Sequence, residues 1–318
     1  MNRFKSARRH ALGLLLGLGL LPAFHGAQAA EPEVLRLGYQ KYGTLVLLKA
    51  QASLEKRLAP LGVSVKWVEF PSGPALLEAL NVGAIDFGQA GETPPIFAQA
   101  AGANLVYVGN EPPEPAGEAI VVTKDSPLKT VAELKGKKIA LNKGSNVHYL
   151  LVRVLEKAGL QYKDVETVFL PPADARAAFE RGSVDAWVIW DPFLAAAEKQ
   201  IGARVLADGK GAVNNHAFFL ASRPYAEKHG PILTALLDEL AKSDQWASQN
   251  RKEVARQIAP LLGLDLATTE LAVNRQNFGV KPISDTVAAE QQRIADTFHQ
   301  LKLIPKPVLV KDALLPKR

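Results

Sequence analysis

The stretch "ALLEALNVGAIDFGQAGETPPIF" at residues 75–97 decides the fold, because a second stretch repeats its pattern later in the chain. That second stretch is "DARAAFERGSVDAWVIWDPF" at residues 174–193. Each contains a helical pattern, a glycine, a β-rich run, and then an acid and a proline that open another helix. Any two α/β segments share some features, but the common Gly-x-x-Asp spacing favours a true repeat and therefore two similar lobes. The matching pairs, each 99 positions apart, are Gly83 and Gly182, Asp86 and Asp185, and Glu92 and Asp191.

Short β-rich runs alternate with longer helical patterns on both sides of this stretch. Such alternation is typical of an α/β fold with a parallel sheet and right-handed crossover helices. The sequence therefore predicts an α/β protein. The β-rich runs lie at 34–39, 63–70, 84–90 and 104–110, and the helical patterns at 44–62, 73–83 and 93–102.

Two segments are suited to carry the chain between the lobes. The first is the proline-rich stretch 110–122, and the second is 214–228, where the regular α/β punctuation ends. Two linkers form a hinge, and two hinged lobes enclose a cleft that can close over a ligand. We expect 30–117 to form the first part of lobe 1, 118–216 to form lobe 2, and 217–318 to return to lobe 1 and add C-terminal helices.

The N-terminus predicts export. Residues 1–29 contain four basic residues and no acid, then an apolar run and the ending Ala27-Gln28-Ala29. These are the parts of a signal peptide, and the apolar run is too short to span a bilayer. We expect cleavage after Ala29 and a periplasmic protein. The residues around Arg8-Arg9 favour the general export route over the twin-arginine route.

The composition argues against several kinds of site and partner. The chain contains no cysteine, which excludes disulfides, thiolate metal sites and a lipid-modified cysteine. Removal of residues 1–29 takes the formal charge from +6 to +2. A nearly neutral chain argues against a nucleic-acid partner, which requires a basic surface. We expect a monomer in free solution.

The sequence "GETPP" at 91–95 concentrates the chemistry that starts a helix. Thr93 or Glu92 can serve as N-cap, and Pro94 suits the first turn. The helix follows a predicted strand, so it begins at the carboxyl edge of the sheet, where α/β folds bind ligands. Free N–H groups at such an edge attract anions. Four helix starts are expected to face the cleft: Gln40–Thr44, Gly91–Thr93, Asn142–Ser145 and Trp190–Asp191.

The loop 142–148 is the richest in hydrogen-bond donors. Gly144 allows a close approach of the backbone, Ser145 supplies a hydroxyl, and Asn142 and Asn146 supply amides. His148, in the first turn of the following helix, completes the candidate site. An ordinary N-cap at Ser145 or at the next asparagine is the alternative, and it is compatible with binding.

Two aromatic and two acidic residues also belong to the candidate site. We expect Trp190 to form a wall of the cleft, and Phe219 to contribute to it from the second crossing. Glu92 and Asp191 are unfavourable beside an anion unless they cap helices or bind an ammonium group. Capping is the preferred interpretation.

Enzyme motifs are missing from the sequence. The chain has no H-E-x-x-H, no G-x-S-x-G, no P-loop and no dinucleotide-binding fingerprint. We expect no catalytic residues, no metal and no cofactor.

Several stretches together resemble the periplasmic aliphatic sulfonate-binding proteins of ABC importers. Besides the two repeats, they are "LRLGYQKYG" (35–43), "YVGNEPP" (107–113), "TVAELKGKKIAL" (130–141) and "RVLADG" (204–209). The resemblance covers essentially the whole chain after the signal. It implies a type II binding protein that delivers its ligand to a membrane permease and its ATPase for sulfur acquisition. The same module could instead be specific for taurine, a sulfate ester, nitrate or another small anion. A remoter alternative is an enzyme like the thiamine-pyrimidine synthases, whose cysteine-rich segment has no counterpart here.

The chemistry of a sulfonate suits these loops. A sulfonate is ionised at every relevant pH and accepts hydrogen bonds through three oxygens, so its site needs donors only. An α-amino acid would normally require an arginine clamp, and the four loops contain no arginine. Taurine would require Glu92 or Asp191 to bind its amine, and an alkyl tail would rest on Trp190 and Phe219. The donors expected for the sulfonate are Gln40, Thr93, Asn142 and Ser145.

Overall fold

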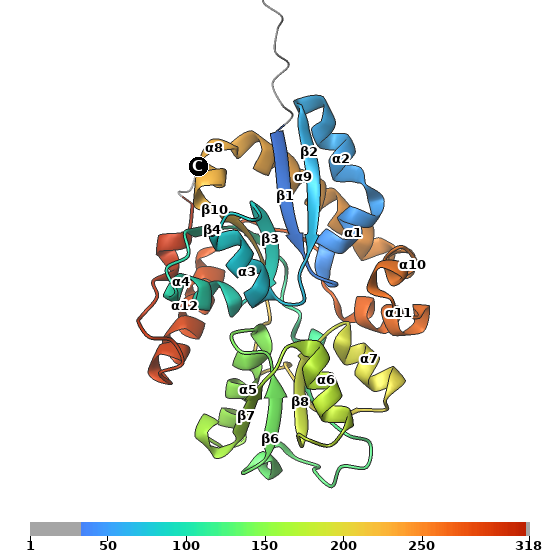
Figure 1. Cartoon of the computed structure of the whole chain (residues 1–318), viewed down its shortest axis with the longest axis vertical. Coiled ribbons are helices and arrows are strands. Elements are labelled where there is room, and N and C mark those ends of the chain that lie inside the picture. Colours follow the sequence, from blue (N-terminus) through green and yellow to red (C-terminus); the bar gives the residue numbers. More distant parts are fainter. Residues whose placement is uncertain (1–32, 316–318) are drawn as a thin grey trace, which may run out of the picture. The chain divides into compact units, whose positions relative to one another are not determined.

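The computed structural model describes residues 33–315, and Figure 1 shows their helices and strands. The predicted export signal at 1–29 lies outside this range. Two five-stranded sheets, each flanked by helices, form the two predicted lobes. None of the helices in the described range combines the length and hydropathy that crossing a membrane requires.

The first sheet has the strand order β2-β1-β3-β10-β4. β1 pairs in parallel with β2 and with β3, whereas β10 runs antiparallel to β3 and β4. The strands are β1 (Glu33–Tyr39), β2 (Val63–Glu69), β3 (Phe87–Gly91), β4 (Leu105–Asn110) and β10 (Ala217–Ser222).

The second sheet has the order β7-β6-β8-β5-β9. β6 pairs in parallel with β7 and β8, and β5 runs antiparallel to β8 and β9. The strands are β5 (Glu118–Val122), β6 (Lys138–Leu141), β7 (Glu166–Phe169), β8 (Ala186–Trp190) and β9 (Arg204–Asp208).

The predicted parallel pairing is therefore found for part of each sheet, and β5 and β10 depart from it. The two antiparallel strands β5 and β10 are the ones that follow the crossings between the lobes. β5 begins with Glu118 opposite Trp190, the last residue of β8, and β10 begins with Ala217 opposite Gly91, the last residue of β3. Each crossing thus enters its new sheet directly at the carboxyl edge, without a crossover helix. The strand must then run back against its neighbours.

Helices cover both faces of the first sheet, with a separate hydrophobic core on each face. One core contains side chains of β1, α1 and α9, and the other contains side chains of α3, α4 and α12. Figure 1 labels all the helices of this part of the chain. They are α1 (Gly43–Gln51), α2 (Ser53–Leu58), α3 (Gly73–Asn81), α4 (Pro94–Ala100), α8 (Arg223–Lys228), α9 (Gly230–Gln249), α10 (Arg251–Leu262), α11 (Leu266–Arg275) and α12 (Asp285–Gln300).

The helix predicted at 44–62 is broken. Ala52 has a φ of 48°, in the left-handed region, and separates α1 from α2. A 3₁₀ turn at Ala59–Leu61 then ends the segment before β2. Alanine favours the helix, so the break reflects tertiary packing rather than local propensity.

The second lobe has a single core built around Trp187, Phe179 and the aliphatic side chains of β5, β6 and β8. Its helices are α5 (Asn146–Lys157), α6 (Pro172–Glu180) and α7 (Phe193–Gln200). α11, which follows the return to the first sheet, packs against α7. Short 3₁₀ turns lie at Pro115–Gly117, Val131–Leu134, Tyr162–Asp164 and Val310–Ala313.

Candidate functional site

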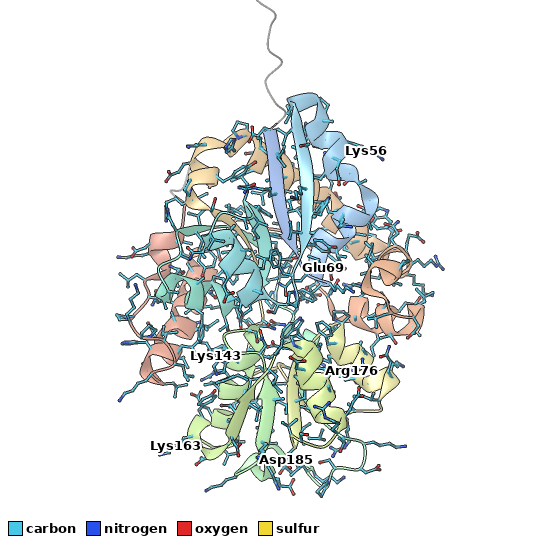
Figure 2. All side chains as sticks on the ribbon, viewed as in Figure 1. Lys56, Glu69, Lys143, Lys163, Arg176 and Asp185 are labelled. Carbon is cyan, nitrogen blue, oxygen red and sulfur yellow. The ribbon has the colours of Figure 1, made fainter. Side chains whose placement is uncertain are left out.

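A small cavity lies at the junction of the two lobes, beside the carboxyl edges of both sheets. Its volume is about 20 Å³, roughly the space of one water molecule. Figure 2 labels Glu69, at the end of β2, and Lys143, just after β6, on these facing edges. Three predicted site residues line the cavity: Gln40, Gly91 and Trp190. The other lining residues are Tyr42, Gly73, Pro94, Asn146, Asn215, His216 and Ala217.

Three helices, α1, α3 and α5, begin beside this cavity. The residues that precede their first turns are Tyr42, Ser72 and Ser145, and none of these side chains forms a capping hydrogen bond within the described residues. In contrast, the side chain of Ser284 caps α12. First-turn N–H groups without side-chain caps, together with the helix dipole, favour a small anion. Each exposed helix end contributes roughly 0.3–1 kcal/mol.

A second, apolar cavity adjoins the first. Its volume is about 190 Å³. It shares Gln40, Tyr42 and Trp190 with the small cavity, and Phe70, Pro71 and Phe193 add apolar surface. The rings of Trp190 and Phe193 meet edge to face, with centroids 6.0 Å apart. An anion with an apolar tail would thus find donors in one cavity and an aromatic wall in the other.

Comparison with known proteins agrees with this geometry. The profile of the NMT1-like family matches residues 28–263. The chain belongs to the NMT1-like family. The resemblance and the two-lobed α/β fold predicted from the sequence are confirmed.

Three proteins similar to this chain bind, by their names, aliphatic sulfonates. The putative aliphatic sulfonates-binding protein of Escherichia coli K12 is 47% identical over 302 residues, 94% of each chain. The alkanesulfonate-binding protein SsuA from Xanthomonas axonopodis pv. citri, solved with bound MOPS, is 47% identical with a TM-score of 0.86, covering 90% of this chain and 99% of that one. The periplasmic aliphatic sulphonate binding protein SsuA from Escherichia coli has 47% identity and a TM-score of 0.81, covering 90% and 93%.

In this NMT1-like chain, Gln40 and Thr93 occupy different settings. Gln40 lines the small cavity, and its Nε2 donates to the backbone oxygen of Gln89 at 3.0 Å. Thr93 precedes α4 without capping it. Its Oγ1 is buried and has no hydrogen-bond partner among residues 33–315.

The predicted donor loop 142–145 divides between two places. Ser145 is buried before α5, and its Oγ donates to the backbone oxygen of Asn142 at 2.7 Å. A hydroxyl has one hydrogen to donate, so this bond occupies the donor that was expected for a ligand. Asn142 and Gly144 line a different cavity, of about 500 Å³, between this loop and helices α3 and α4. The structure therefore does not bring these two residues to the small cavity.

His148 is buried away from both cavities that adjoin Trp190. Its Nδ1 accepts a hydrogen bond from the N–H of Gly144 at 3.3 Å, so its hydrogen is on Nε2, which lies 2.7 Å from the hydroxyl of Tyr162. The ring packs against Phe97 and Phe298. Burial lowers the pKa of His148 to about 3. The neutral ring holds the 142–145 loop, and contact with a ligand, as predicted, does not fit this position.

Asp191 agrees with the capping interpretation. Its Oδ1 accepts a hydrogen bond from the N–H of Ala195, in the first turn of α7, at 2.9 Å. Arg275 of α11 lies 3.4 Å from both carboxylate oxygens and 2.5 Å from Glu198. Burial raises the pKa of Asp191 to about 7, although the Arg275 charge opposes this effect. Asp191 is fully buried.

Glu92 does not cap α4, so that part of the prediction is wrong. Its Oε2 accepts a hydrogen bond from the backbone N–H of His216 at 3.2 Å, on the second crossing. Its Oε1 has no partner among the described residues. Burial raises the pKa of Glu92 to about 8.

The assignment of Phe219 to the cleft wall is also wrong. Side chains alternate along β10, which places Phe219 in the core beneath α1 and α9. Its ring stacks on Phe87, with centroids 6.0 Å apart. Phe218 points to the opposite face and packs edge to face on Tyr107.

Asn146, expected to supply an amide donor, does line the small cavity, whereas its neighbours Asn215 and Glu118 were not expected there. Asn146 Nδ2 donates to Glu118 Oε2 at 2.5 Å and lies 3.2 Å from the side-chain oxygen of Asn215. Burial and the charge of Glu92 raise the pKa of Glu118 well above its ordinary value. The asparagines in 142–148 and 214–216 were the sequence feature that could have pointed to these residues. Glu118 gave none, because its role depends on a partner 28 positions away.

Proposed function

We propose that this protein captures aliphatic sulfonates in the periplasm and delivers them to an ABC importer for sulfur acquisition. The observation that carries the proposal is the small cavity, which both lobes line with polar groups and helix starts and which adjoins an aromatic wall. The names of the relatives at 47% identity agree with it.

The buried acids are compatible with an anionic ligand. Two carboxyl groups, Glu92 and Glu118, lie beside the cavity, and burial raises both pKa values. An acid whose pKa lies above the ambient pH is mostly uncharged. At pH 7 these groups therefore do not repel a sulfonate.

Ligand entry requires the lobes to separate. A volume of about 20 Å³ holds about one water, and a sulfonate group needs more space. We infer that the lobes, with boundaries at 117/118 and 216/217, open around the two crossings and close on the ligand. The closed form would be the one that a membrane permease recognises.

The remaining parts of the proposal concern partners and chemistry. We propose that an export signal is removed after Ala29, that the mature protein is monomeric, and that a permease with a cytoplasmic ATPase receives the ligand. We also propose that it is not an enzyme. The neutral, fully bonded His148 and the engagement of Ser145 with Asn142 support this view, because neither group is poised as a base or a nucleophile.

Isothermal titration calorimetry of the refolded, ligand-stripped mature chain tests the proposal. The ligands are ethanesulfonate, pentanesulfonate, sulfate and nitrate. We expect micromolar or tighter binding of the alkanesulfonates, about 8 kcal/mol or more, and much weaker binding of sulfate and nitrate. Pentanesulfonate should bind more tightly than ethanesulfonate because each additional buried CH₂ contributes about 0.8 kcal/mol. Equal affinity for sulfate and the alkanesulfonates would contradict the proposal.

A further inference from the structure

Aromatic rings from both lobes meet beside the loop 142–148. Phe97 of α4 and Phe298 of α12 come from lobe 1, and His148 of α5 comes from lobe 2. The centroid of the His148 ring lies 6.0 Å from that of Phe97 and 5.1 Å from that of Phe298, and the two phenylalanine rings meet edge to face at 5.0 Å. We call these three residues the aromatic latch. None of the three lines the small cavity or the apolar cavity.

The aromatic latch is closely packed across the lobe junction. His148 and Phe298 are both 0% exposed. Phe97 also lies against the backbone of Gly144, because a Cβ added to this glycine would be 3.1 Å from the Phe97 ring. The N–H of Gly144 donates to Nδ1 of His148, so the loop and the histidine form one unit of lobe 2. Separation of the lobes would therefore take both phenylalanine rings away from His148 and let water reach it.

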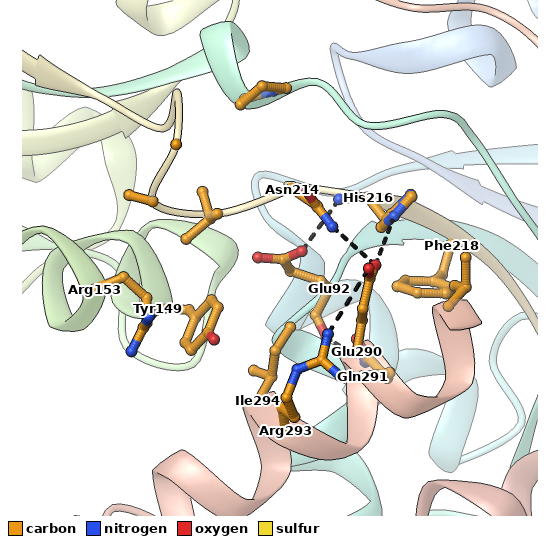
Figure 3. Close-up of a pocket in the computed structure, with 15 residues that line it drawn as sticks. Glu92, Tyr149, Arg153, Asn214, His216, Phe218, Glu290, Gln291, Arg293 and Ile294 are labelled. Atoms are coloured by element: carbon orange, nitrogen blue, oxygen red, sulfur yellow. Dashed lines mark hydrogen bonds and ion pairs between the residues drawn. The ribbon is translucent and has the colours of Figure 1, made fainter. Parts of the chain in front are cut away.

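The rings are what bridges α5 and α12. Figure 3 shows a cavity of about 390 Å³ that these two helices line together, with Arg153 on the first and Arg293 on the second. Each arginine pairs with a glutamate of its own helix. Further along α12, the ring of Phe298 meets those of His148 and Tyr149. Aromatic packing, and not pairing of these two arginines, thus joins the helices across the lobe junction.

The same packing keeps the His148 ring neutral. Burial, helped by the charge of Lys143, lowers the pKa of His148 to about 3 in the form that the structure shows. The titratable groups that face the ring are Lys143 and Tyr162, and its other neighbours are phenylalanine rings of α4, β7 and α12. The rings of α4 and α12 belong to lobe 1. Their departure would return water to His148 and move its pKa toward the ordinary value of 6.5.

We propose that His148 is a positioning residue for ligand capture, which through the aromatic latch sets the balance between the closed and open forms and makes this balance depend on pH. The inference rests on the proposed function, in which the lobes close on a sulfonate. A ligand that binds the closed form has an apparent affinity reduced by the fraction of protein that is open. Protonation of His148 favours the open form, so acid should weaken the binding of every sulfonate by the same factor, whatever its tail.

The acids Glu92 and Glu118 act in the opposite direction. Burial raises the pKa of each, so the closed form holds their protons more tightly than an open, wetter form does. Acid should favour closure through these two groups. The effect of His148 is therefore measured as a ratio between two proteins that differ only at position 148.

The experiment measures the dissociation constants of ethanesulfonate and pentanesulfonate by calorimetry between pH 7.5 and pH 5. The proteins are the wild type, His148→Gln and the control His229→Gln, and circular dichroism checks that each is folded at each pH. Glutamine can accept the bond from Gly144 but cannot take up a proton. The control histidine stacks on Tyr225 within lobe 1, away from the lobe junction.

We expect the ratio of the wild-type to the His148→Gln dissociation constant to rise by about threefold to about thirtyfold from pH 7.5 to pH 5. The upper limit applies if the pKa of His148 in the open form reaches 6.5. The factor should be the same for both ligands. The ratio of the wild type to His229→Gln should stay constant.

A second variant tests the aromatic latch from the other lobe. Phe97→Ala should weaken ethanesulfonate and pentanesulfonate equally at pH 7.5, by about threefold to tenfold, because it removes an aromatic contact that the closed form alone makes. In contrast, Phe193→Ala, on the wall of the apolar cavity, should weaken pentanesulfonate more than ethanesulfonate. Phe97→Ala also decides the matter if His148→Gln does not fold.

Two results would overturn the inference and leave the proposed function standing. One is a ratio of wild type to His148→Gln that changes by less than about threefold between pH 7.5 and pH 5. The other is a loss in Phe97→Ala that grows with the length of the ligand's tail. Failure of the wild type to bind either ligand at pH 7.5 would contradict the proposed function and the inference together.

Discussion

Asp86 and Asp185, which are 99 positions apart, make the same pair of backbone hydrogen bonds in the two lobes. The Asp86 carboxylate accepts from the N–H of Arg36 at 2.8 Å, and its own N–H donates to the oxygen of that residue at 2.8 Å. Asp185 makes both bonds with Lys138 at the same distances. Each aspartate thus ties the residue before its own strand to the strand beside it, at Arg36 within β1 and at Lys138 at the start of β6. The repeat seen in the sequence is therefore a repeat of contacts.

The two aspartates differ in burial, which leads to a first prediction. Asp86 is buried and also binds the Arg36 guanidinium through Nε at 2.9 Å, whereas Asp185 is exposed. Hydrogen bonds to a buried charge contribute more than exposed ones. We expect Asp86→Ala to lower the free energy of unfolding by about 2–3 kcal/mol and Asp185→Ala by about 0.5–1.5 kcal/mol. Urea unfolding followed by circular dichroism measures both, and an equal or larger loss for Asp185→Ala would contradict the ranking.

The features that could be predicted from the sequence are those that short local patterns encode. The glycine and aspartate of each repeat, and the acid with proline that follows, placed the helix starts at the carboxyl edges correctly. Contacts between distant segments were not predictable. The left-handed Ala52 breaks a helix without a glycine or proline signal. Glu92 bonds to a residue 124 positions away, so neither its partner nor its burial could be read from the flanking residues.

The position of Phe219 shows a further limit. Alternation along β10 fixes that Phe218 and Phe219 face opposite ways, but it does not say which face is which. That choice depends on where the strand enters the sheet, and β10 enters antiparallel between β3 and β4. The pairing of β10 with its neighbours therefore sets the face on which Phe219 lies, and the local sequence does not contain this information.

Gly91 provides a prediction about lobe closure. A Cβ at this position would lie 2.9 Å from the Cβ of Asn146, on the other lobe. We expect Gly91→Ala to hold the lobes apart and to weaken alkanesulfonate binding by about tenfold or more, with little change in thermal unfolding. Calorimetry measures the affinity, and small-angle scattering with saturating ligand should show a larger radius of gyration than the wild type.

The control for Gly91→Ala is Gly117→Ala, on the first crossing. The nearest atom to a Cβ there is Asn215 Nδ2 at 3.8 Å, an ordinary contact. This variant should bind and close as the wild type does. Wild-type affinity in Gly91→Ala would show that the 2.9 Å approach is not needed for the liganded form.

His148 predicts a loss of stability in acid. The pKa of His148 in the folded protein, about 3, lies below the ordinary histidine pKa of 6.5, so the unfolded chain binds a proton more readily. The contribution of His148 to the free energy of unfolding should therefore fall as the pH drops from 6.5 toward 3, by up to about 1.4 kcal/mol per pH unit, against the opposite contribution of the buried acids. His148→Gln should be less stable than the wild type at pH 7, and the difference between the two proteins should shrink as the pH falls. Urea unfolding between pH 7 and 4.5 measures the slopes, and the exposed His299→Gln is the control.

Glu114 should give the free energy of unfolding the opposite dependence on pH, in a higher pH range. It is buried on the first crossing, where it accepts hydrogen bonds from the N–H of Asn277 at 2.8 Å and from the hydroxyl of Tyr42. Burial raises the pKa of Glu114 to about 8 from its ordinary value of 4.5. The folded state holds this proton more tightly, so its contribution is complete below pH 4.5 and is lost as the pH rises through 8.

The window from pH 6.5 to 8 separates Glu114 from His148, because His148 is neutral in both the folded and unfolded chain above pH 6.5. In this window Glu114→Gln should remove a fall in the free energy of unfolding of up to about 1.4 kcal/mol per pH unit. The raised pKa values of Glu92 and Asp191 act in the same direction, so a reduced slope should remain in the variant. The exposed Glu227→Gln should keep the full wild-type slope. An unchanged slope in Glu114→Gln would mean that Glu114 is ionised at neutral pH, with the bonds from Asn277 and Tyr42 sufficient to stabilise its buried charge.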